Sequence, residues 1–468
     1  GKHVQYTKLT NSSQSLQDYK ETLLEDFEKN QNLFADVEYK DEIETLLFDT
    51  KFYETDKVNI KSDLLFKKIY PPLNYFEDSW IRRSYYGGLS MVDFKNVEKY
   101  SKYKNKIGQV FDVNSLYPYI MLDKVLPVGR GTYSKKPYQN MSKKYKQQNN
   151  LYIQEITIFD MKIKEGKTPF VQVKDRSDFN GREVIEENIN LNGERVPITL
   201  RLCNPLYELL WDNYHINGFE LGGHYGFRGK KNMFKNYLDF WGEVKKNSVG
   251  CERAISKLRQ NAIYGKFGTN GECEVIVTTS ENKTWKVINT HQNFVGDTIY
   301  LPMATFITSY AKQYLVNSIN QNRDKFLYCD TDSLHLFGEA EEVKGLKIDS
   351  KIYGAWKHEL TFYDFRYLGP KRYAEYNGEE WDIKCCGLTS TIMKQLKDIN
   401  TFEMCEYTSK ELNKIKLYTK KDDIYYYKDK ECTQRVKGLF KSKKSRIVKN
   451  GTLIVEQPYM LNTNPFSY

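Results

Sequence analysis

Two aspartates separated by one residue mark the segment of the chain best suited to chemistry. Asp330 and Asp332 lie between two runs of apolar, strand-forming residues, which predicts a β-hairpin with both carboxylates at its turn. Like charges this close raise each other's pKa unless a cation lies between them, and Mg²⁺ prefers oxygen ligands. Because Asp-Thr-Asp-Ser also suits an ordinary Asx turn, this segment alone leaves both a metal site and a plain turn open.

A third carboxylate, Asp112, is expected at the end of an apolar strand. Ser115 follows at a position that suits the N-cap of a helix beginning at Leu116. A carboxylate at a strand end that faces a carboxylate hairpin is the donor set of a two-metal phosphoryl-transfer site, whose metals lie about 4 Å apart. The alternative is an aspartate that simply ends a strand.

The segment 232–265 is predicted to be helical, with a break near residues 248–250. On a helix, one stripe about 80° wide carries two cations, an amide and a phenol: Arg253, Lys257, Asn261 and Tyr264. The opposite side is apolar and is expected to be buried: Cys251, Ile255, Leu258 and Ala262. Two cations one turn apart need an anion, which a triphosphate would supply; the alternative is a solvated basic face.

Together these segments resemble three motifs of family B DNA polymerases, in the family's order. Residues 112–118 resemble motif A, residues 257–265 motif B and residues 328–333 motif C. Tyr85-Tyr86-Gly87-Gly88 resembles the family's YxGG motif, and Lys371-Arg372-Tyr373 its KxY motif. The short section after Cys386 and the run from Ile383 to Gly387 are similar to the protein-primed branch found in phages and linear plasmids. Ala262 departs from the serine that motif B usually carries.

The resemblance implies a role for each matching residue. It implies three catalytic carboxylates: Asp112, Asp330 and Asp332. Two Mg²⁺ ions, with Mn²⁺ as a substitute, would be held by Asp112, Val113 and Asp332. The incoming nucleotide would meet Val113, Tyr117, Arg253, Lys257, Asn261 and Tyr264, with Tyr117 rejecting a 2′-hydroxyl. Primer and template would meet Tyr85, Gly87, Gly88, Thr331, Lys371 and Tyr373.

The fold class implied is α+β: a right-hand polymerase fold with an antiparallel palm sheet, helical fingers, a small thumb and two insertions. The expected divisions are an N-terminal segment of unclear role (1–80), first palm part (81–123), terminal-protein region 1 (124–232), fingers (233–268), terminal-protein region 2 (269–300), second palm part (301–386) and thumb (387–468). Strand-like material is expected to begin after Pro71-Pro72.

Composition agrees with a polyanion partner. The chain of 468 residues carries a formal net charge of +10, and residues 410–449 hold 14 basic and 5 acidic side chains interleaved with aromatic ones. This segment predicts either a folded surface that follows a phosphate backbone or a solvated tail. The eight cysteines form no CxxC pair, so free thiols and no structural zinc are expected. No apolar run of about 18 residues occurs, so neither a membrane span nor a membrane partner is expected.

The expected function is template-directed synthesis of DNA by two-metal nucleotidyl transfer, in protein-primed replication of a viral or plasmid genome. The expected partners are primer-template DNA, dNTPs and a terminal protein that serves as primer. Asp36-Val37-Glu38 has the DxE pattern of the family's exonuclease, but fewer than 50 residues separate it from Tyr85, too few for that domain. A separate exonuclease chain is therefore left open as a further partner. The expected location is the cytoplasm. Two alternatives stay open: a non-catalytic DNA-binding remnant, and a reverse transcriptase or RNA polymerase with a similar palm.

Overall fold

The computed structural model describes residues 68–172, 184–190, 192–269 and 300–385. Beyond these ranges it describes the backbones of six strands: β7 (Glu272–Thr278), β8 (Trp285–His291), β15 (Glu406–Tyr407), β16 (Gln434–Arg435), β17 (Gly438–Val448) and β18 (Gly451–Leu461). The expectations for residues 1–67, for the side chains of 270–299 and for those of the basic section 410–449 lie outside the described residues.

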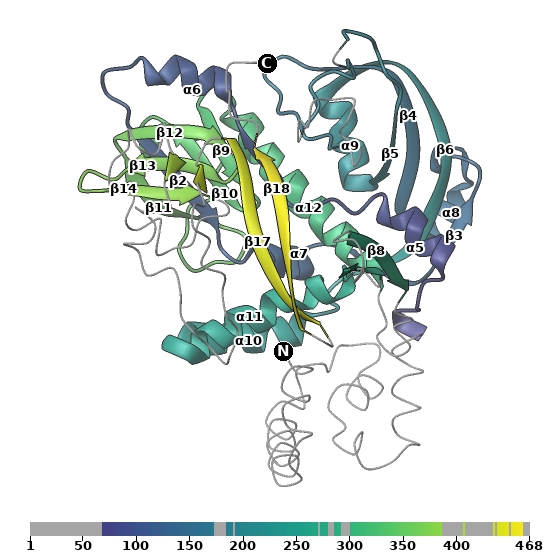
Figure 1. Cartoon of the computed structure of the whole chain (residues 1–468). Helices are drawn as coiled ribbons and strands as arrows, with labels where there is room; N and C mark the ends of the chain where they lie inside the picture. Colours follow the sequence, from purple (N-terminus) through teal and green to yellow (C-terminus); the bar gives the residue numbers. More distant parts are fainter. Residues whose placement is uncertain are drawn as a thin grey trace.

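An antiparallel sheet of five strands holds the carboxylates predicted from the sequence (Figure 1). Its order is β1 (Ser90–Val92), β9 (Phe326–Asp330), β10 (Ser333–Phe337), β2 (Gly108–Val113) and β11 (Trp356–Phe362). The predicted hairpin is the pair β9–β10, and the predicted strand that leads to Asp112 is β2. Both strands of this hairpin and β2 consist largely of buried β-branched, aromatic or leucine residues, which suit a sheet that is covered on both faces.

The two aspartates lie on either side of a tight turn between β9 and β10. Asp330 ends β9, whereas Asp332 lies in the turn after Thr331, whose φ is +62°. The Thr331 N–H donates to the Leu89 carbonyl at 2.7 Å, and the Asp332 N–H donates to the Asp330 carbonyl at 2.7 Å. The turn is therefore fixed from both sides.

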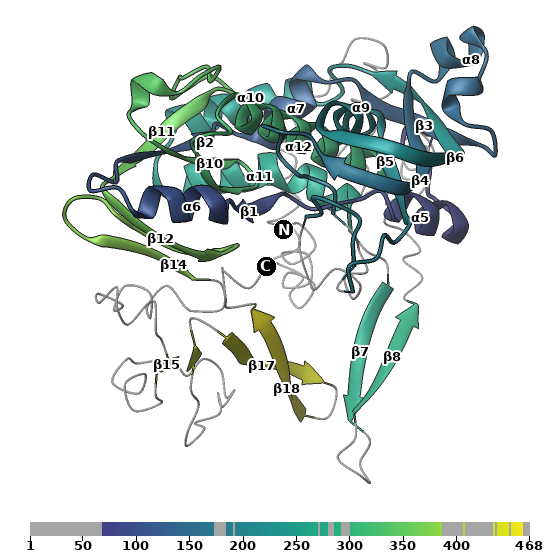
Figure 2. The same ribbon diagram turned by 90° about the horizontal axis from the view of Figure 1, so that it is seen from above.

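A second, three-stranded antiparallel sheet lies over one face of the first (Figures 1 and 2). It consists of β12 (Asp364–Gly369), β13 (Arg372–Tyr376) and β14 (Trp381–Cys385). Helix α6 (Phe94–Ser101) packs near β9 and β12, and the short helix η5 (Ala340–Glu342) follows β10. A compact apolar cluster that includes Leu327, Tyr328 and Phe365 fills the space between the two sheets.

A four-stranded antiparallel sheet lies within the segment predicted as the first insertion. Its order is β3 (Leu126–Ser134), β6 (Tyr214–Lys230), β4 (Leu151–Ile163) and β5 (Ile198–Cys203). Its accompanying helices are η3 (Tyr138–Asn140), α8 (Lys143–Gln148) and α9 (Asn204–Asn213). Further along the chain, β7 and β8 pair as a two-stranded hairpin that extends away from the main body (Figure 2), and β17 pairs with β18.

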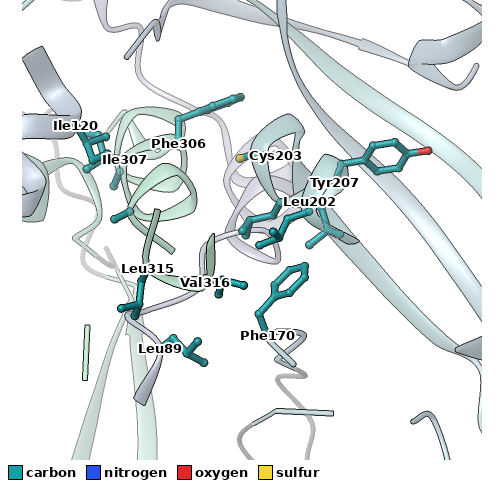
Figure 3. Packing of buried hydrophobic residues seen from close by; sticks show 14 of the residues in the cluster. Leu89, Ile120, Phe170, Leu202, Cys203, Tyr207, Phe306, Ile307, Leu315 and Val316 are labelled. Atoms are coloured by element: carbon teal, nitrogen blue, oxygen red, sulfur yellow. The ribbon is translucent and has the colours of Figure 1, made fainter. Parts of the chain in front are cut away.

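The main core surrounds one long helix, α12 (Leu301–Gln321). It contacts β3 and β5 of the four-stranded sheet, and its Tyr314 stacks on Trp356 of the five-stranded one. Figure 3 shows its side chains Phe306, Ile307, Leu315 and Val316 near Ile120 of helix α7 (Leu116–Asp123) and near β5 and α9. Each fully buried apolar side chain of this size contributes about 1.5–3 kcal/mol. Polar side chains inside the helix are satisfied locally, because the hydroxyls of Thr305 and Ser309 donate to carbonyls four residues earlier. Within the described residues, no helix is both long and apolar enough to cross a bilayer.

The predicted break divides segment 232–265 into two packed helices, α10 (Lys235–Asn247) and α11 (Gly250–Phe267). The prediction of an apolar buried back on α11 is wrong. Ile255 and Leu258 are 49% and 65% exposed, whereas Ser256, Gln260 and Phe267 are buried. The buried stripe is rotated by roughly 150° from the apolar one. It packs on α10 through Gln260, whose amide donates to the Leu238 carbonyl at 3.2 Å and to the Tyr353 hydroxyl at 2.6 Å. It also packs through Phe267, whose ring lies 6.1 Å from that of Phe234.

The first element after Pro71-Pro72 is helix α5 (Tyr75–Arg82), and the expected strands begin only at β1. Helix α5 starts with a capping box. The Asn74 side chain accepts from the Glu77 N–H at 2.9 Å, and the Glu77 carboxylate accepts from the Asn74 N–H at 3.0 Å. Two otherwise unpaired backbone donors are thereby satisfied, which outweighs the aromatic, strand-like composition of the segment.

Replacing Asp93 by Ala should lower the free energy of unfolding by about 3 kcal/mol, because it leaves a half-buried cation without its partner. Asp93 is 6% exposed, accepts from the Asn96 N–H at the start of α6 and forms an ion pair with Arg323. Urea titration would measure the change. The control Ser142→Ala removes a cap from α8 that bonds no buried charge, and it should lose about 1 kcal/mol. Equal losses in the two variants would contradict the role given to the ion pair.

Candidate active site

The two carboxylates Asp112 and Asp332 come together at one end of the five-stranded sheet. Asp112 is the fifth residue of β2 and lies opposite Ser333 of β10 in the antiparallel register. The Val113 N–H donates to the Asp332 carbonyl at 2.8 Å, which ties the turn of the hairpin to the end of β2. Strand pairing therefore places Asp112, predicted at a strand end, beside Asp332 of the predicted hairpin.

Their electrostatics is that of two anions held close in a half-buried place. Burial, followed by Asp332 and Glu359, raises the pKa of Asp112 to about 7, while Lys257 and Lys357 lower it less. Burial, and then Asp330, also raises the pKa of Asp332. Protonation or a bound cation would relieve this repulsion.

Asp330 has a different environment from the other two carboxylates. Its oxygens accept from the Lys371 ammonium at 2.6 and 2.8 Å. The Tyr328 hydroxyl donates to it at 3.4 Å. In this arrangement Asp330 binds the turn that follows β12 through Lys371.

Lys257 and Lys245 of the two helices act on these carboxylates, and Arg253 adjoins Lys245. The charge of Lys257 on α11 acts on both Asp112 and Asp332. The Arg253 guanidinium, one turn earlier, donates to the Lys245 carbonyl at 2.7 Å. Lys245 itself, near the end of α10, donates to the Ser115 hydroxyl at 2.7 Å. Burial and the neighbouring Lys257 and Arg253 lower the pKa of Lys245, which indicates a positive region prepared for an anion.

Two aromatic rings lie beside the carboxylates. The ring of Tyr117, in the first turn of α7, stacks on that of Tyr264 with centroids 4.0 Å apart and planes at 30°. Burial and the neighbouring Tyr264 raise the pKa of Tyr117 far above its ordinary value, so its hydroxyl stays protonated. Asn261 is half-buried on α11, one turn from Lys257. The four residues predicted to share a stripe therefore do lie on the site side of α11.

The segment 85–88 meets the turn of the carboxylate hairpin. A side chain at Gly88 would lie 2.3 Å from the Thr331 hydroxyl, so only glycine allows this close approach. Gly87 has open space beside it. Tyr85 lies between this segment and α11: its hydroxyl approaches Gly268, and burial together with Tyr264 raises its pKa.

Lys371 and Tyr373 reach the same region from the three-stranded sheet. Lys371 forms the tight turn between β12 and β13 with a φ of +58°, and its N–H donates to the Tyr328 hydroxyl at 3.1 Å. The Tyr373 ring lies 4.8 Å from that of Tyr328. All five predicted motifs are thus adjacent in space.

The donor set fits a hard divalent cation that keeps part of its coordination for other ligands. No group of three or more His, Cys, Asp or Glu side chains suited to a metal occurs in the described ranges. Asp112, Asp332 and the Val113 carbonyl offer only oxygens, and few of them. Mg²⁺ is usually held by one or two carboxylates together with phosphate oxygens and water, which matches this set.

Sequence reasoning missed Lys245 and misjudged Ser115. Two lysines at the end of a helix are common because they favour the negative end of the helix dipole, and this ordinary explanation concealed Lys245. Ser115 does precede α7, but its side chain makes no capping bond and accepts from Lys245 instead. Its φ of +50° directs the chain from β2 into α7.

Sequence comparison connects the chain to known proteins. Residues 3–351 match the family described as DNA polymerase type B, organellar and viral. The DNA polymerase of Bacillus phage Nf is 32% identical over 357 residues, which cover 72% of this chain and 60% of that protein. The DNA polymerase of Bacillus phage phi29 is 30% identical over 357 residues, which cover 72% of this chain and 59% of that protein. The matched part of the chain thus spans about 60% of the length of these curated relatives.

Structure comparison agrees with the sequences. Phi29 DNA polymerase, solved as a ternary complex with primer-template DNA and incoming nucleotide substrates, superposes with a TM-score of 0.65 at 26% identity. The match covers 90% of this chain and 67% of that one. The expected α+β right-hand polymerase fold is thereby confirmed, while the exact divisions between its parts stay a prediction.

Replacing Asp112 by Asn should stabilise the metal-free protein at pH 8. The folded-state pKa near 7 lies above the ordinary value of 3.8, so the folded protein binds this proton more tightly than the unfolded chain. Its contribution to stability therefore falls as pH rises from about 4 to about 7 and stays low above that range. The variant should accordingly show a higher Tm than the wild type at pH 8 in the presence of a chelator, with the difference vanishing near pH 4.

Asp123→Asn is the control for this prediction. A hydrogen bond from Lys124 lowers the pKa of Asp123, so its removal should decrease the Tm at pH 8. A wild type that is more stable than Asp112→Asn at pH 8 would show that the two carboxylates do not repel each other as described.

Proposed function

The chain belongs to the organellar and viral type B DNA polymerases, and from this premise we propose that it copies a DNA template by adding dNTPs to a primer 3′-hydroxyl. One observation carries the proposal: Asp112 and Asp332 meet at the sheet end that faces Lys245 and Lys257. Two anions opposite a group of cations form a site for a molecule that brings both phosphates and a divalent metal.

Asp112, Asp332 and the Val113 carbonyl are the residues that would hold Mg²⁺, or Mn²⁺ in its place. The metal would supply charge neutralisation at the attacking and leaving oxygens of the displacement. The primer O3′ would form a bond to the α-phosphorus of the dNTP while the bond to the β-phosphate oxygen breaks and pyrophosphate leaves. Asp330, paired with Lys371, would support the primer side of the site.

The triphosphate would be bound by the cations of the two helices. Lys257 lies nearest the carboxylates, and Lys245 joins it from α10 with its ammonium fixed by Ser115. Arg253 would bind the outer phosphates. Its guanidinium donates to the Lys245 carbonyl at the helix break, which places this cation beside Lys245. Charge-assisted hydrogen bonds of this kind are about twice as strong as neutral ones.

The sugar and base of the nucleotide would lie against the two stacked rings of Tyr117 and Tyr264. Tyr117 would lie under the sugar, and its ring would clash with a 2′-hydroxyl. Tyr264 and Asn261 would line the nascent base pair. On the DNA side, Lys371 and Tyr373 would bind the primer terminus. The template and primer backbones would contact Tyr85, Gly87, Gly88 and Thr331. They would pass closest at Gly87, beside which there is open space.

We further propose a protein primer, whose hydroxyl would replace the 3′-hydroxyl of DNA in the first step. Two features support this proposal: the likeness to the polymerases of Bacillus phages, and the four-stranded sheet at the position of the first insertion. This sheet would contact the terminal protein, and the hairpin β7–β8 would assist strand displacement.

Replacing Asp332 by Asn should lower the rate of primer extension by about 1,000-fold, because the loss of a metal ligand removes several kcal/mol of transition-state stabilisation. Affinity for duplex DNA should change little, since it depends mainly on phosphate contacts elsewhere. A gel assay with labelled primer, template, dNTPs and Mg²⁺ measures the first quantity, and fluorescence anisotropy the second. The exposed Glu341 is the control, and Glu341→Gln should extend normally. Near wild-type extension by Asp332→Asn would sink the proposed site.

Replacing Tyr117 by Val should allow the enzyme to use ribonucleotides. A clash discriminates by excluded volume, and its removal should lower the ratio of kcat/KM for dNTP to that for rNTP by at least about tenfold, or about 1.4 kcal/mol. Steady-state kinetics with matched nucleotides measures this ratio. Tyr117→Phe retains the ring and should retain the discrimination. A wild type that prefers rNTPs would point instead to an RNA polymerase, and an unchanged ratio in Tyr117→Val would exclude Tyr117 as the gate.

A further inference from the structure

Two ionisable side chains are buried between the five-stranded sheet and the three-stranded sheet, and neither takes part in any step described above. His335 of β10 is 1% exposed and Glu375 of β13 is 2% exposed. They lie in the small core that includes Leu327 and Phe365. A buried carboxylate without a partner is costly, so such a pair persists in an apolar core only when its hydrogen bonds are made.

The pair joins the sheets by side chains. The five-stranded and three-stranded sheets are separate in their backbone pairing throughout the described strands. His335 Nδ1 lies 2.6 Å from Glu375 Oε1, and the Tyr367 hydroxyl of β12 donates to the same oxygen. Burial and the Glu375 carboxylate raise the pKa of Tyr367 well above its ordinary value, so this hydroxyl keeps its proton and remains a donor.

From this pair, direct contacts lead to the turn that would hold the primer. The His335 ring packs edge-on against Tyr328 and Tyr373, with centroids 4.9 and 5.2 Å apart. The Tyr328 hydroxyl accepts the N–H of Lys371 at 3.1 Å and donates to Asp330 at 3.4 Å. Glu375 and Tyr373 are two residues apart on β13 and therefore point to the same face of that sheet.

Apolar contacts between two sheets tolerate small sliding movements, whereas a buried, hydrogen-bonded pair is satisfied at one relative position only. We propose that Glu375 and His335 are positioning residues that fix the primer-binding sheet, with Lys371 and Tyr373, relative to the carboxylate hairpin. This proposal rests on the proposed function and deepens it. Neither residue touches a substrate; they set the distance between the primer terminus and Asp332.

The test separates primer binding from nucleotide binding. In Glu375→Ala, the KM for primer-template should rise about tenfold, while the KM for dNTP should stay within about twofold of the wild-type value. Glu375→Gln keeps an oxygen that accepts from both partners and should restore the primer KM. Gln154→Ala is the matched control, because Gln154 is equally buried and bonds the Gly222 and Gly223 carbonyls in the distant four-stranded sheet. It should lose stability without a change in either KM.

A second variant and a binding assay keep the test decisive. If Glu375→Ala does not fold, Tyr367→Phe removes only one hydroxyl and should raise the primer KM about twofold to threefold. Anisotropy without nucleotide should show weaker binding of a recessed 3′ end but unchanged binding of blunt duplex. An unchanged primer KM in a folded variant, or equal weakening for both DNAs, would overturn the positioning role. Failure of the wild type to extend primers would instead overturn the proposed function, and the binding comparison would still decide this proposal.

Discussion

The structure depends on keeping two carboxylates close together without exposing them fully to water. Strand pairing achieves this. The Val113 N–H donates to the Asp332 carbonyl, so Asp112 and Asp332 cannot separate unless the pairing of β2 with β10 is broken. Burial then raises both pKa values. Repulsion of this kind costs folding free energy, and it is compensated by the long apolar core around α12, in which each large side chain contributes about 1.5–3 kcal/mol. The free energy gained by packing the core thus offsets the cost of the repulsion at the site.

The cations are arranged around the same constraint. Lys257 and Lys245 come from two helices whose interface combines the Gln260 bonds with the apolar contacts of Leu238 and Phe267. These contacts lie on the side of α11 that faces away from its apolar stripe. This explains why α11 leaves Ile255 and Leu258 in solvent. The hydrogen bonds of the interface specify one relative position of the helices, and a site that binds phosphates needs such a fixed spacing between cations.

The primer side follows the same physical rule. Glu375, His335 and Tyr367 form a buried polar contact between two sheets, and Tyr328 transmits its position to Asp330 and to the backbone of Lys371. Glycine is needed at position 88, where the segment 85–88 touches Thr331. Each element that meets the carboxylate hairpin is therefore held by directional bonds or by close backbone contact, within an otherwise apolar molecule.

Four features could be predicted from the amino-acid sequence: the carboxylate hairpin, the strand that leads to Asp112, the helix break before Gly250, and the stripe of Arg253, Lys257, Asn261 and Tyr264. Each of these features is a pattern among residues that are close together in the sequence, and the motifs also follow one another in a recognisable order. Three features depend on the folded chain: the side of α11 that is buried, the bond of Ser115 to Lys245 in place of a helix cap, and the contact of Glu375 with His335 forty residues away. Periodicity shows which residues share a face, but the partner that covers the face comes from distant parts of the chain, and side-chain hydrogen bonds across such distances leave no local pattern.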